Sequence, residues 1–93
     1  MRVIWSSPAL DDIEAAHRYI SLDNPIAAKR LVERIFTAAA RLKDLPEMGR
    51  IGRRQGTREL VVTGTPYIIM YEFGDQRVEV LRVMHGARRW PAD

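Results

Sequence analysis

The first part of the chain repeats its hydrophobic residues at helical spacing. A run of branched and aromatic residues, Arg2-Val3-Ile4-Trp5, comes first and predicts a short strand. Ser6-Ser7-Pro8 then places a helix-capping residue before a proline, which is typical of a helix start. The positions that follow on one face are Leu10, Ile13, His17 and Ile20. We therefore predict a helix over about residues 8–22.

A second helix starts at Asn24-Pro25, which repeats the signal of a cap followed by proline. Its apolar stripe is the widest in the chain and consists of Ala28, Leu31, Val32, Ile35, Phe36, Ala39, Leu42 and Leu45. Pro46 and Gly49 are expected to end it. Because the connection at Asp23-Asn24 is so short, the two helices are expected to form an antiparallel hairpin.

The second part of the chain has the pattern of strands joined by turns. We predict a basic loop over residues 48–58, a strand over 59–62, a turn over 63–66, a central strand over 67–73 and a last strand over 77–84. The central run is apolar on both faces, which indicates a strand inside a sheet. The resulting fold class is α+β in the order β-α-α-β-β-β, a single domain over residues 1–93. Its helical hairpin packs on an antiparallel sheet.

Gly74-Asp75 is the expected hairpin turn between the last two strands. It sets Phe73 opposite Gln76, and Glu72 opposite Arg77 as a favourable charge pair. This register gathers an apolar sheet face for the helices, made of Tyr67, Ile69, Tyr71, Phe73, Val78 and Val80. It also puts Arg82 beside Tyr67 at the edge of that face.

Composition then limits the chemistry that the chain can carry. Its 93 residues include no cysteine, which excludes a disulfide scaffold, a thiolate zinc site and thiol catalysis. No apolar run approaches membrane-spanning length, so we expect a cytoplasmic protein without a membrane partner. Fifteen basic and twelve acidic residues give a net charge of +3, and all but two of the bases are arginine. That excess suggests an anionic partner, since arginine binds carboxylate and phosphate bidentately, although genomic codon bias would also raise the arginine count.

The arginines gather in two segments, together with a histidine and a tryptophan: Arg50, Arg53, Arg54 and Arg58, and then Arg82, His85, Arg88, Arg89 and Trp90. If the sheet brings these segments together, they form one basic face suited to phosphate or carboxylate groups. The alternative is a solvated, arginine-rich surface. His17 and His85 are far apart in sequence and no carboxylate stands at ligand spacing from either, so neither a metal nor a cofactor is expected. Ser6 and Ser7 are explained as helix caps.

Several short segments, in their order along the chain, resemble the RelE/ParE superfamily of bacterial toxins from type II toxin–antitoxin pairs. They are Ser7-Pro8-Ala9, Leu45-Pro46, Met48-Gly49-Arg50, Arg58-Glu59-Leu60, Pro66-Tyr67-Ile68-Ile69-Met70-Tyr71 and Leu81-Arg82-Val83-Met84-His85-Gly86-Ala87-Arg88. The last two segments carry most of the likeness. The resemblance covers nearly the whole chain and implies the same fold class.

Two kinds of toxin share this resemblance. RelE-like members cleave messenger RNA on the ribosome, whereas ParE-like members poison DNA gyrase without cleaving RNA. The RelE pattern has an arginine after the tyrosine of the central strand, where this chain has Ile68, and a tyrosine or histidine near the C-terminus, where it has Trp90. An isoleucine cannot stabilise a phosphorane and an indole cannot titrate. The likeness therefore favours a ParE-like, non-enzymatic toxin whose target-binding candidates are the two arginine segments. The alternative is a RelE-like ribonuclease that uses Arg82, His85 and Arg88.

The resemblance also implies a partner, a ParD-like antitoxin with an acidic and apolar tail. Such a complex is a heterotetramer or larger, and the antitoxin rather than the toxin reads DNA. A basic toxin with grooves along its helices suits an amphipathic segment. The antitoxin-binding candidates are Arg30, Arg34, Arg41, Tyr67 and Tyr71.

Overall fold

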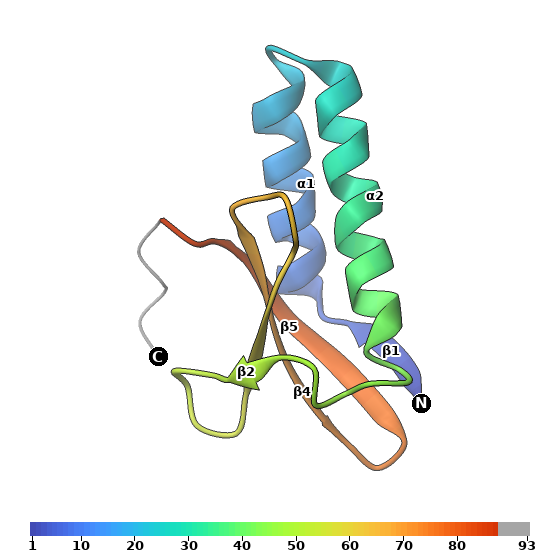
Figure 1. Ribbon diagram of the computed structural model, residues 1–93. Coiled ribbons are helices and arrows are strands. Elements are labelled where there is room, and N and C mark those ends of the chain that lie inside the picture. The colour runs from blue at the N-terminus through green and yellow to red at the C-terminus, as the bar shows by residue number, and fades with distance from the viewer. Residues whose placement is uncertain (88–93) are drawn as a thin grey trace.

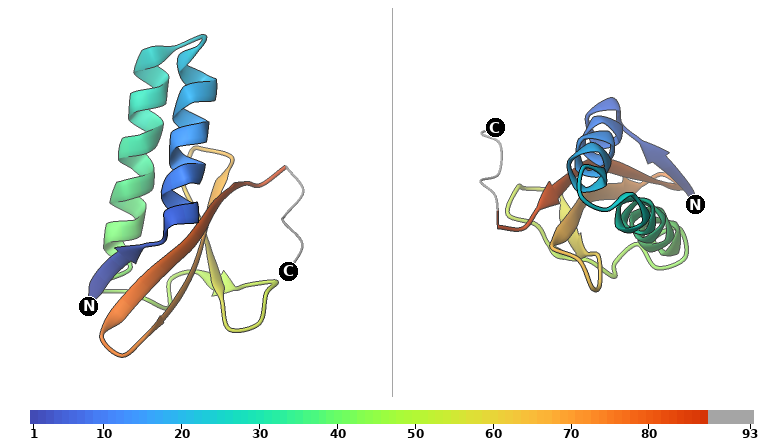
Figure 2. Two further views of the ribbon diagram at one scale, coloured as in Figure 1. Left: turned by 180° about the vertical axis from the view of Figure 1, so that it is seen from behind. Right: turned by 90° about the horizontal axis from the view of Figure 1, so that it is seen from above.

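Two long helices stand side by side and pack against one face of a twisted five-stranded sheet (Figure 1), in a computed structural model that describes residues 1–87. The elements are β1 (Arg2–Trp5), α1 (Ser7–Ser21), α2 (Pro25–Arg41), β2 (Arg50–Ile51), β3 (Arg58–Val61), β4 (Tyr67–Gly74) and β5 (Arg77–His85). The hairpin of α1 and α2 extends beyond the sheet at its connecting end (Figure 2). The predicted α+β fold class and the antiparallel helical hairpin are confirmed.

Both helices begin where the sequence predicts. Ser6 caps α1 and its hydroxyl accepts a hydrogen bond from the Ala9 amide, while the Asn24 side chain caps α2 and accepts from the Ala27 amide. The predicted end of the second helix is wrong, because α2 stops at Arg41 and Leu45 is exposed rather than part of a buried stripe. The residue before a proline avoids helical backbone angles, so the chain unwinds into tight turns ahead of Pro46.

The strand order across the sheet is β1-β5-β4-β3-β2. From β5 to β2 all neighbours are antiparallel, as predicted, but β1 pairs with β5 in parallel. The sheet is therefore mixed, because the last strand, β5, lies beside the first strand, β1, and runs in the same direction. The two-residue strand β2 lies within the segment predicted as a loop.

The turn between β4 and β5 differs from the prediction. Asp75 and Gln76 are the turn residues, with φ angles of 48° and 66°, and Gly74 pairs with Arg77. Positive φ at both central positions is typical of a type I′ turn, whose twist matches that of the two strands in a hairpin. Glu72 consequently lies opposite Glu79, so its predicted pairing with Arg77 is wrong. Because the register moves by two positions between Tyr71 and Val80, the side chains of this part of the hairpin keep their predicted faces.

A β-bulge then changes the position of Arg82. Tyr71 pairs with Val80 but Met70 pairs with Arg82, which leaves Leu81 as the extra residue. Tyr67 lies opposite His85, so the predicted placement of Arg82 beside Tyr67 is wrong. The bulge sends Arg82 to the sheet face that the helices do not cover.

The core lies between the helical hairpin and the sheet. It combines small helix residues with apolar strand residues: Ala9, Ile13, Ala16, Leu31, Ile35, Ala39, Leu42, Val62, Tyr67, Ile69, Tyr71, Val78, Val80 and Val83. Tyr71 is fully buried, and its hydroxyl donates to the Pro46 carbonyl at 2.6 Å and accepts from the Gly49 amide at 2.9 Å. Burial raises the pKa of Tyr71. The hydroxyl thereby ties the segment after α2 to the sheet.

No helix within residues 1–87 is both long and apolar enough to span a membrane.

Candidate functional site

The strand register brings one arginine of each segment, Arg50 and Arg82, onto one row of the sheet face opposite the helices. Arg50 pairs with Glu59, Glu59 with Met70, and Met70 with Arg82, so one row of directly opposed residues crosses β2, β3, β4 and β5. Side chains of directly opposed residues lie on the same face. The sheet therefore gathers residues that are up to 32 positions apart in the chain, from Arg50 to Arg82. We call this surface the open face.

Glu59 is the buried centre of this row, with only 3 % of its surface exposed. Oε1 accepts from Arg50 Nη2 at 3.1 Å and from Arg53 Nη2 at 3.3 Å, and Oε2 accepts from the Arg53 amide at 3.0 Å and from Arg53 Nε at 3.1 Å. Burial raises the pKa of Glu59, but the hydrogen bonds from Arg53 and Arg50 outweigh it and hold the pKa below its ordinary value of 4.5. Two of the predicted target-binding arginines are thus held in place by one carboxylate.

The loop between β2 and β3 is folded tightly around these contacts. The Gly52 amide donates to the Thr57 carbonyl at 2.8 Å, and the buried Thr57 hydroxyl donates to the Arg54 carbonyl at 2.6 Å. This closure gives the loop a defined shape with Arg54 near its tip. Glu59, which organises these contacts, was not predicted from the sequence. The signal that could have found it is a single acid in a strand that directly follows four arginines without an acid between them.

Arg58 belongs to the other face. It pairs with Tyr71 across the sheet, and its guanidinium carbon lies 5.7 Å from the centre of the Phe73 ring. Its Nη1 donates to the Gly49 carbonyl at 2.9 Å and to the Glu47 carbonyl at 3.3 Å. The structure therefore separates Arg58 from the other three arginines of its segment and uses it to hold the chain after α2.

Arg82 forms a bidentate pair with Asp12 of α1. Arg82 Nε lies 2.7 Å from Asp12 Oδ2 and Nη2 lies 2.8 Å from Oδ1, and the Val83 amide donates to Oδ2 at 2.9 Å. The hydrogen bonds that Arg82 donates to Asp12 raise the pKa of Arg82. Asp12 lies within α1 and is not among the residues that the sequence singled out. The structure shows that it anchors α1 to β5 and fixes the Arg82 side chain.

Arg54 and Arg82 line the same hollow of about 520 Å³ on the open face, together with Gln55, Glu72 and the start of α1 at Ser6. The side chain of Arg82 retains 30 % of its surface exposed there. The hollow thus joins one member of each predicted arginine segment, with an acidic residue at its side.

His85 lies on the helix side of the sheet. Its ring meets Tyr67 edge-on, with 5.3 Å between ring centres, and its Nδ1 accepts from the Ala87 amide at 3.2 Å. His85 and Tyr67 line a hollow of about 360 Å³ beneath the end of the helical hairpin, which has no residue in common with the hollow at Arg82. The other candidates of this segment, Arg88, Arg89 and Trp90, lie outside the described residues.

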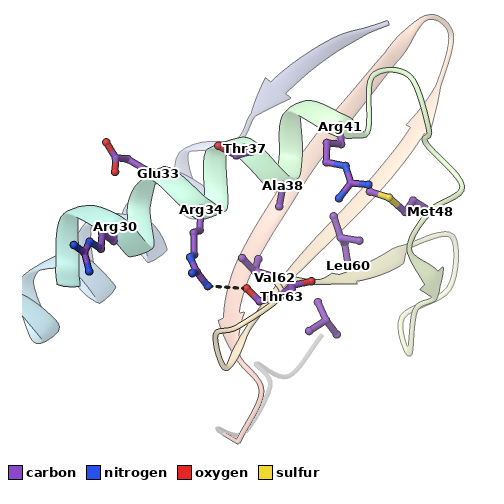
Figure 3. Close-up of a pocket in the computed structure, with 11 residues that line it drawn as sticks. Arg30, Glu33, Arg34, Thr37, Ala38, Arg41, Met48, Leu60, Val62 and Thr63 are labelled. Atoms are coloured by element: carbon purple, nitrogen blue, oxygen red, sulfur yellow. Dashed lines mark hydrogen bonds between the residues drawn. The ribbon is translucent and has the colours of Figure 1, made fainter. Parts of the chain in front are cut away.

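A groove of about 710 Å³ runs between α2 and β3 (Figure 3). Arg30, Arg34 and Arg41 line it from the helix, and Leu60, Val61 and Val62 form its apolar side on the sheet. Arg34 reaches across and donates from Nη1 to the Thr63 carbonyl at 3.2 Å, whereas Arg41 extends toward Met48 (Figure 3). The three predicted arginines are therefore brought together. Tyr67 and Tyr71 are instead buried in the core and do not line this groove.

No cluster of three or more histidine, aspartate or glutamate side chains suited to a metal occurs within residues 1–87. The polar features of that region are the arginine row on the open face and the basic groove along α2. Both suit the binding of an anionic or acidic partner.

The chain is similar to known toxins along almost its full length. Residues 3–90 match the family described as ParE toxin of type II toxin-antitoxin system, parDE. The candidate toxin Y4kP of Sinorhizobium fredii is 44 % identical over 97 % of this chain and 93 % of its own length. Toxin RelE2 of Caulobacter vibrioides is 41 % identical over 94 % of this chain and 97 % of its own length.

Two solved structures share the fold. The chromosomal ParDE TA system from P. aeruginosa has a TM-score of 0.82 at 23 % identity, over 91 % of this chain and 95 % of that one. The YoeB/ParE toxin from Agrobacterium tumefaciens has a TM-score of 0.62 at 22 % identity, over 91 % of this chain and 98 % of that one. At these identities the likeness extends to the arrangement of helices and strands.

Proposed function

Because the chain belongs to the ParE toxin family of type II toxin–antitoxin systems, we propose that it is a ParE-like toxin that inhibits DNA gyrase by docking on it. A ParD-like antitoxin neutralises it. One observation carries the choice of a docking toxin: Arg82 and His85 lie on opposite faces of the sheet and line separate hollows. Side chains that point to opposite faces of the sheet are poorly placed to act on the same phosphate.

The surroundings of Arg82, His85 and Ile68 also favour a docking toxin over a ribonuclease. A ribonuclease needs a cation beside the scissile phosphate and an acid or base within hydrogen-bond reach of the reacting oxygen. Both oxygens of Asp12 already bind the Arg82 guanidinium, and His85 packs its ring against Tyr67. Ile68, at the position where the RelE pattern has an arginine, is 8 % exposed.

The docking surface in this proposal is the open face of the sheet. Glu59 fixes Arg50 and Arg53, and Asp12 fixes Arg82, so these cations hold defined positions before any partner arrives. A preorganised cation loses less entropy on binding than a free one. Arg54, Arg88, Arg89 and Trp90 complete the proposed target-binding set. Arg58 and His85 are left out of it because they face the helix side.

The direct test is a gyrase supercoiling assay with the purified full-length chain. We expect the chain to inhibit supercoiling and Arg54→Glu to weaken that inhibition by about tenfold, since a reversed charge at a contact costs about 1.4 kcal/mol or more. Arg58→Met serves as the matched control and is expected to inhibit like the unaltered chain once folding is verified. Full supercoiling at saturating toxin would refute the proposal.

A RelE-like ribonuclease is the second candidate, and a relative that is named toxin RelE2 at 41 % identity favours it. In this alternative Arg82, His85 and Arg88 carry the reaction. The discriminating experiment follows defined transcripts after induction of the chain in cells. Cleavage that disappears in the His85→Ala variant would establish the ribonuclease, whereas intact transcripts together with growth arrest would exclude it.

The groove along α2 is the proposed binding site for the antitoxin. Its apolar side at Leu60, Val61 and Val62 and its three arginines match a segment that is both apolar and acidic. Val61 is half exposed, which leaves apolar area for a partner to cover. We expect a heterotetramer or larger assembly, in which the antitoxin reads the DNA.

Charge reversal along α2 tests this site. Arg34→Glu is expected to weaken antitoxin binding by about tenfold or more, because it removes one attractive pair and adds a repulsive one. Lys29→Glu lies on the same helix outside the groove and is the matched control. Isothermal titration with the protein encoded beside this gene would measure both. Equal affinity of the two variants would contradict the assignment.

A further inference from the structure

We propose that the outer edge of β1 is a second protein-binding site, which takes an extended acidic and apolar segment as an added strand. β1 is the last strand on its side of the sheet, and within residues 1–87 it pairs with β5 alone. Its other edge carries main-chain groups that a further strand could bind. This site lies on the opposite flank of α2 from the proposed antitoxin groove.

The hydrogen bonds of β1 show which residues face outward. The Arg2 amide donates to the Gln76 carbonyl at 3.1 Å and the Ser6 amide to the Val80 carbonyl at 3.0 Å. In a parallel pair the bonds alternate along the strand, so the even-numbered residues face β5. Val3 and Trp5 therefore direct their amides and carbonyls toward the free edge.

Apart from its shortness and the charge on Arg2, this edge lacks the usual protection against pairing. Proteins guard exposed strands with charged side chains, prolines or bulges. Val3, Ile4 and Trp5 form an uninterrupted apolar run with none of these. The strand is short, so an added segment of about four to six residues would match it.

A hollow of about 510 Å³ opens beside the same edge and would receive the side chains of an added strand. Val3 and Trp5 line it from β1, and Phe36 and Ala40 line it from α2. The rings of Trp5 and Phe36 lie 4.7 Å apart, and Phe36 retains 40 % of its surface exposed. An apolar side chain on alternate positions of the partner would cover this aromatic pair.

The rim of the hollow selects the charge of the partner. Arg2 and Lys43 are its two charged residues, and both are basic. A second copy of this chain would bring the same basic rim to a symmetric interface and repel the first. An acidic segment would pair with both charges, so the partner combines alternate apolar residues with carboxylates.

The test uses the ¹⁵N-labelled full-length chain, made by cell-free synthesis, and a six-residue peptide of alternating glutamate and valine. We expect saturable shifts at the Val3 and Trp5 amides. A peptide with lysine in place of each glutamate is the matched probe and is expected to produce none. Binding of both peptides alike, or no shift at millimolar peptide, would overturn the proposal.

Three variants locate the site. The double variant Arg2→Glu with Lys43→Glu changes only rim charges and is expected to weaken peptide binding by about tenfold. Val3→Pro removes one outward amide and is expected to weaken it by about fivefold, with its fold checked by circular dichroism. Arg34→Glu in the α2 groove is expected to leave it unchanged. Loss of peptide binding in Arg34→Glu alone, or a dimer by sedimentation that Val3→Pro abolishes, would contradict this assignment.

Discussion

Replacing Glu59 by glutamine tests whether one buried carboxylate organises the arginines of the open face. The change keeps the size of the side chain and removes its charge. A glutamine oxygen can still accept two of the four hydrogen bonds, but its amide nitrogen would face donors of Arg53 or Arg50. Two charge-assisted hydrogen bonds are therefore lost. The two donors that made them then face the amide nitrogen of the glutamine, which is itself a donor and cannot accept.

The magnitude follows from those losses and from the exposure of the partners. Hydrogen bonds to charged groups contribute about 1.5–3 kcal/mol each, so two of them give about 3–6 kcal/mol. The side chains of Arg50 and Arg53 are 59 % and 50 % exposed and can return to water, which roughly halves the loss. We expect Glu59→Gln to lower the free energy of unfolding by about 2–3 kcal/mol. For a domain of this size the melting temperature falls by roughly 10–20 °C.

Urea unfolding followed by circular dichroism measures this loss. Glu72→Gln is the matched control, because Glu72 is an exposed carboxylate on the same face, and its cost is expected to stay within about 0.5 kcal/mol. Equal stability of the two variants would refute the role given to Glu59. So would a Glu59→Gln loss that persists unchanged after both arginines are replaced by methionine.

The same residue predicts a pH dependence. The pKa of Glu59 is lower in the folded state than its ordinary value of 4.5, so the unfolded chain binds the proton more readily. The contribution of Glu59 is therefore complete above about pH 4.5 and is lost as the pH falls through the folded-state pKa. Stability should decline below pH 4.5 more steeply in the unaltered chain than in Glu59→Gln. Parallel curves for the two proteins would contradict the assignment.

Three further substitutions test contacts that hold α1 and the segment after α2 to the sheet, and urea unfolding measures the cost of each. Gly49→Ala should cost about 1–3 kcal/mol, because its Cβ would lie 2.7 Å from the Tyr71 hydroxyl, whereas Gly74→Ala meets nothing within 4 Å and should cost under about 0.5 kcal/mol. Equal costs would contradict this. Tyr71→Phe should cost about 1–3 kcal/mol by leaving the buried Gly49 amide and the partly buried Pro46 carbonyl without their partner, and a neutral effect would refute this role of the hydroxyl. Ser6→Ala should cost about 1–2 kcal/mol through the lost cap and the lost bond to the Leu81 carbonyl; no loss would show that water replaces both.

The sequence predicted the elements well and their ends less well. Capping residues at Ser6 and Asn24 act locally, so both helix starts could be placed from the sequence alone. The hairpin turn could not, because Asp75 and Gln76 adopt positive φ angles that Gly74 would have been expected to supply. The bulge at Leu81 depends on neighbouring strands and has no signal within the last strand itself.

The candidate site shows the same limit. The sequence located the arginine segments, but only the register of four strands could show that Arg50 and Arg82 share one row. It could not show which arginines are held by carboxylates, because the contact between Asp12 and Arg82 joins residues 70 positions apart. Tyr67 and Tyr71 were predicted as partner contacts, but aromatic residues are common in cores as well as at interfaces. Their burial assigns them to the core.

We propose that this toxin docks on gyrase rather than acting on the ribosome. The most direct measurement immobilises the full-length chain through a residue of the helical hairpin and compares its binding to purified gyrase and to purified ribosomes. We predict saturable binding to gyrase, weakened about tenfold by Arg54→Glu, and no saturable binding to ribosomes. Saturable binding to ribosomes, with none to gyrase, would contradict it.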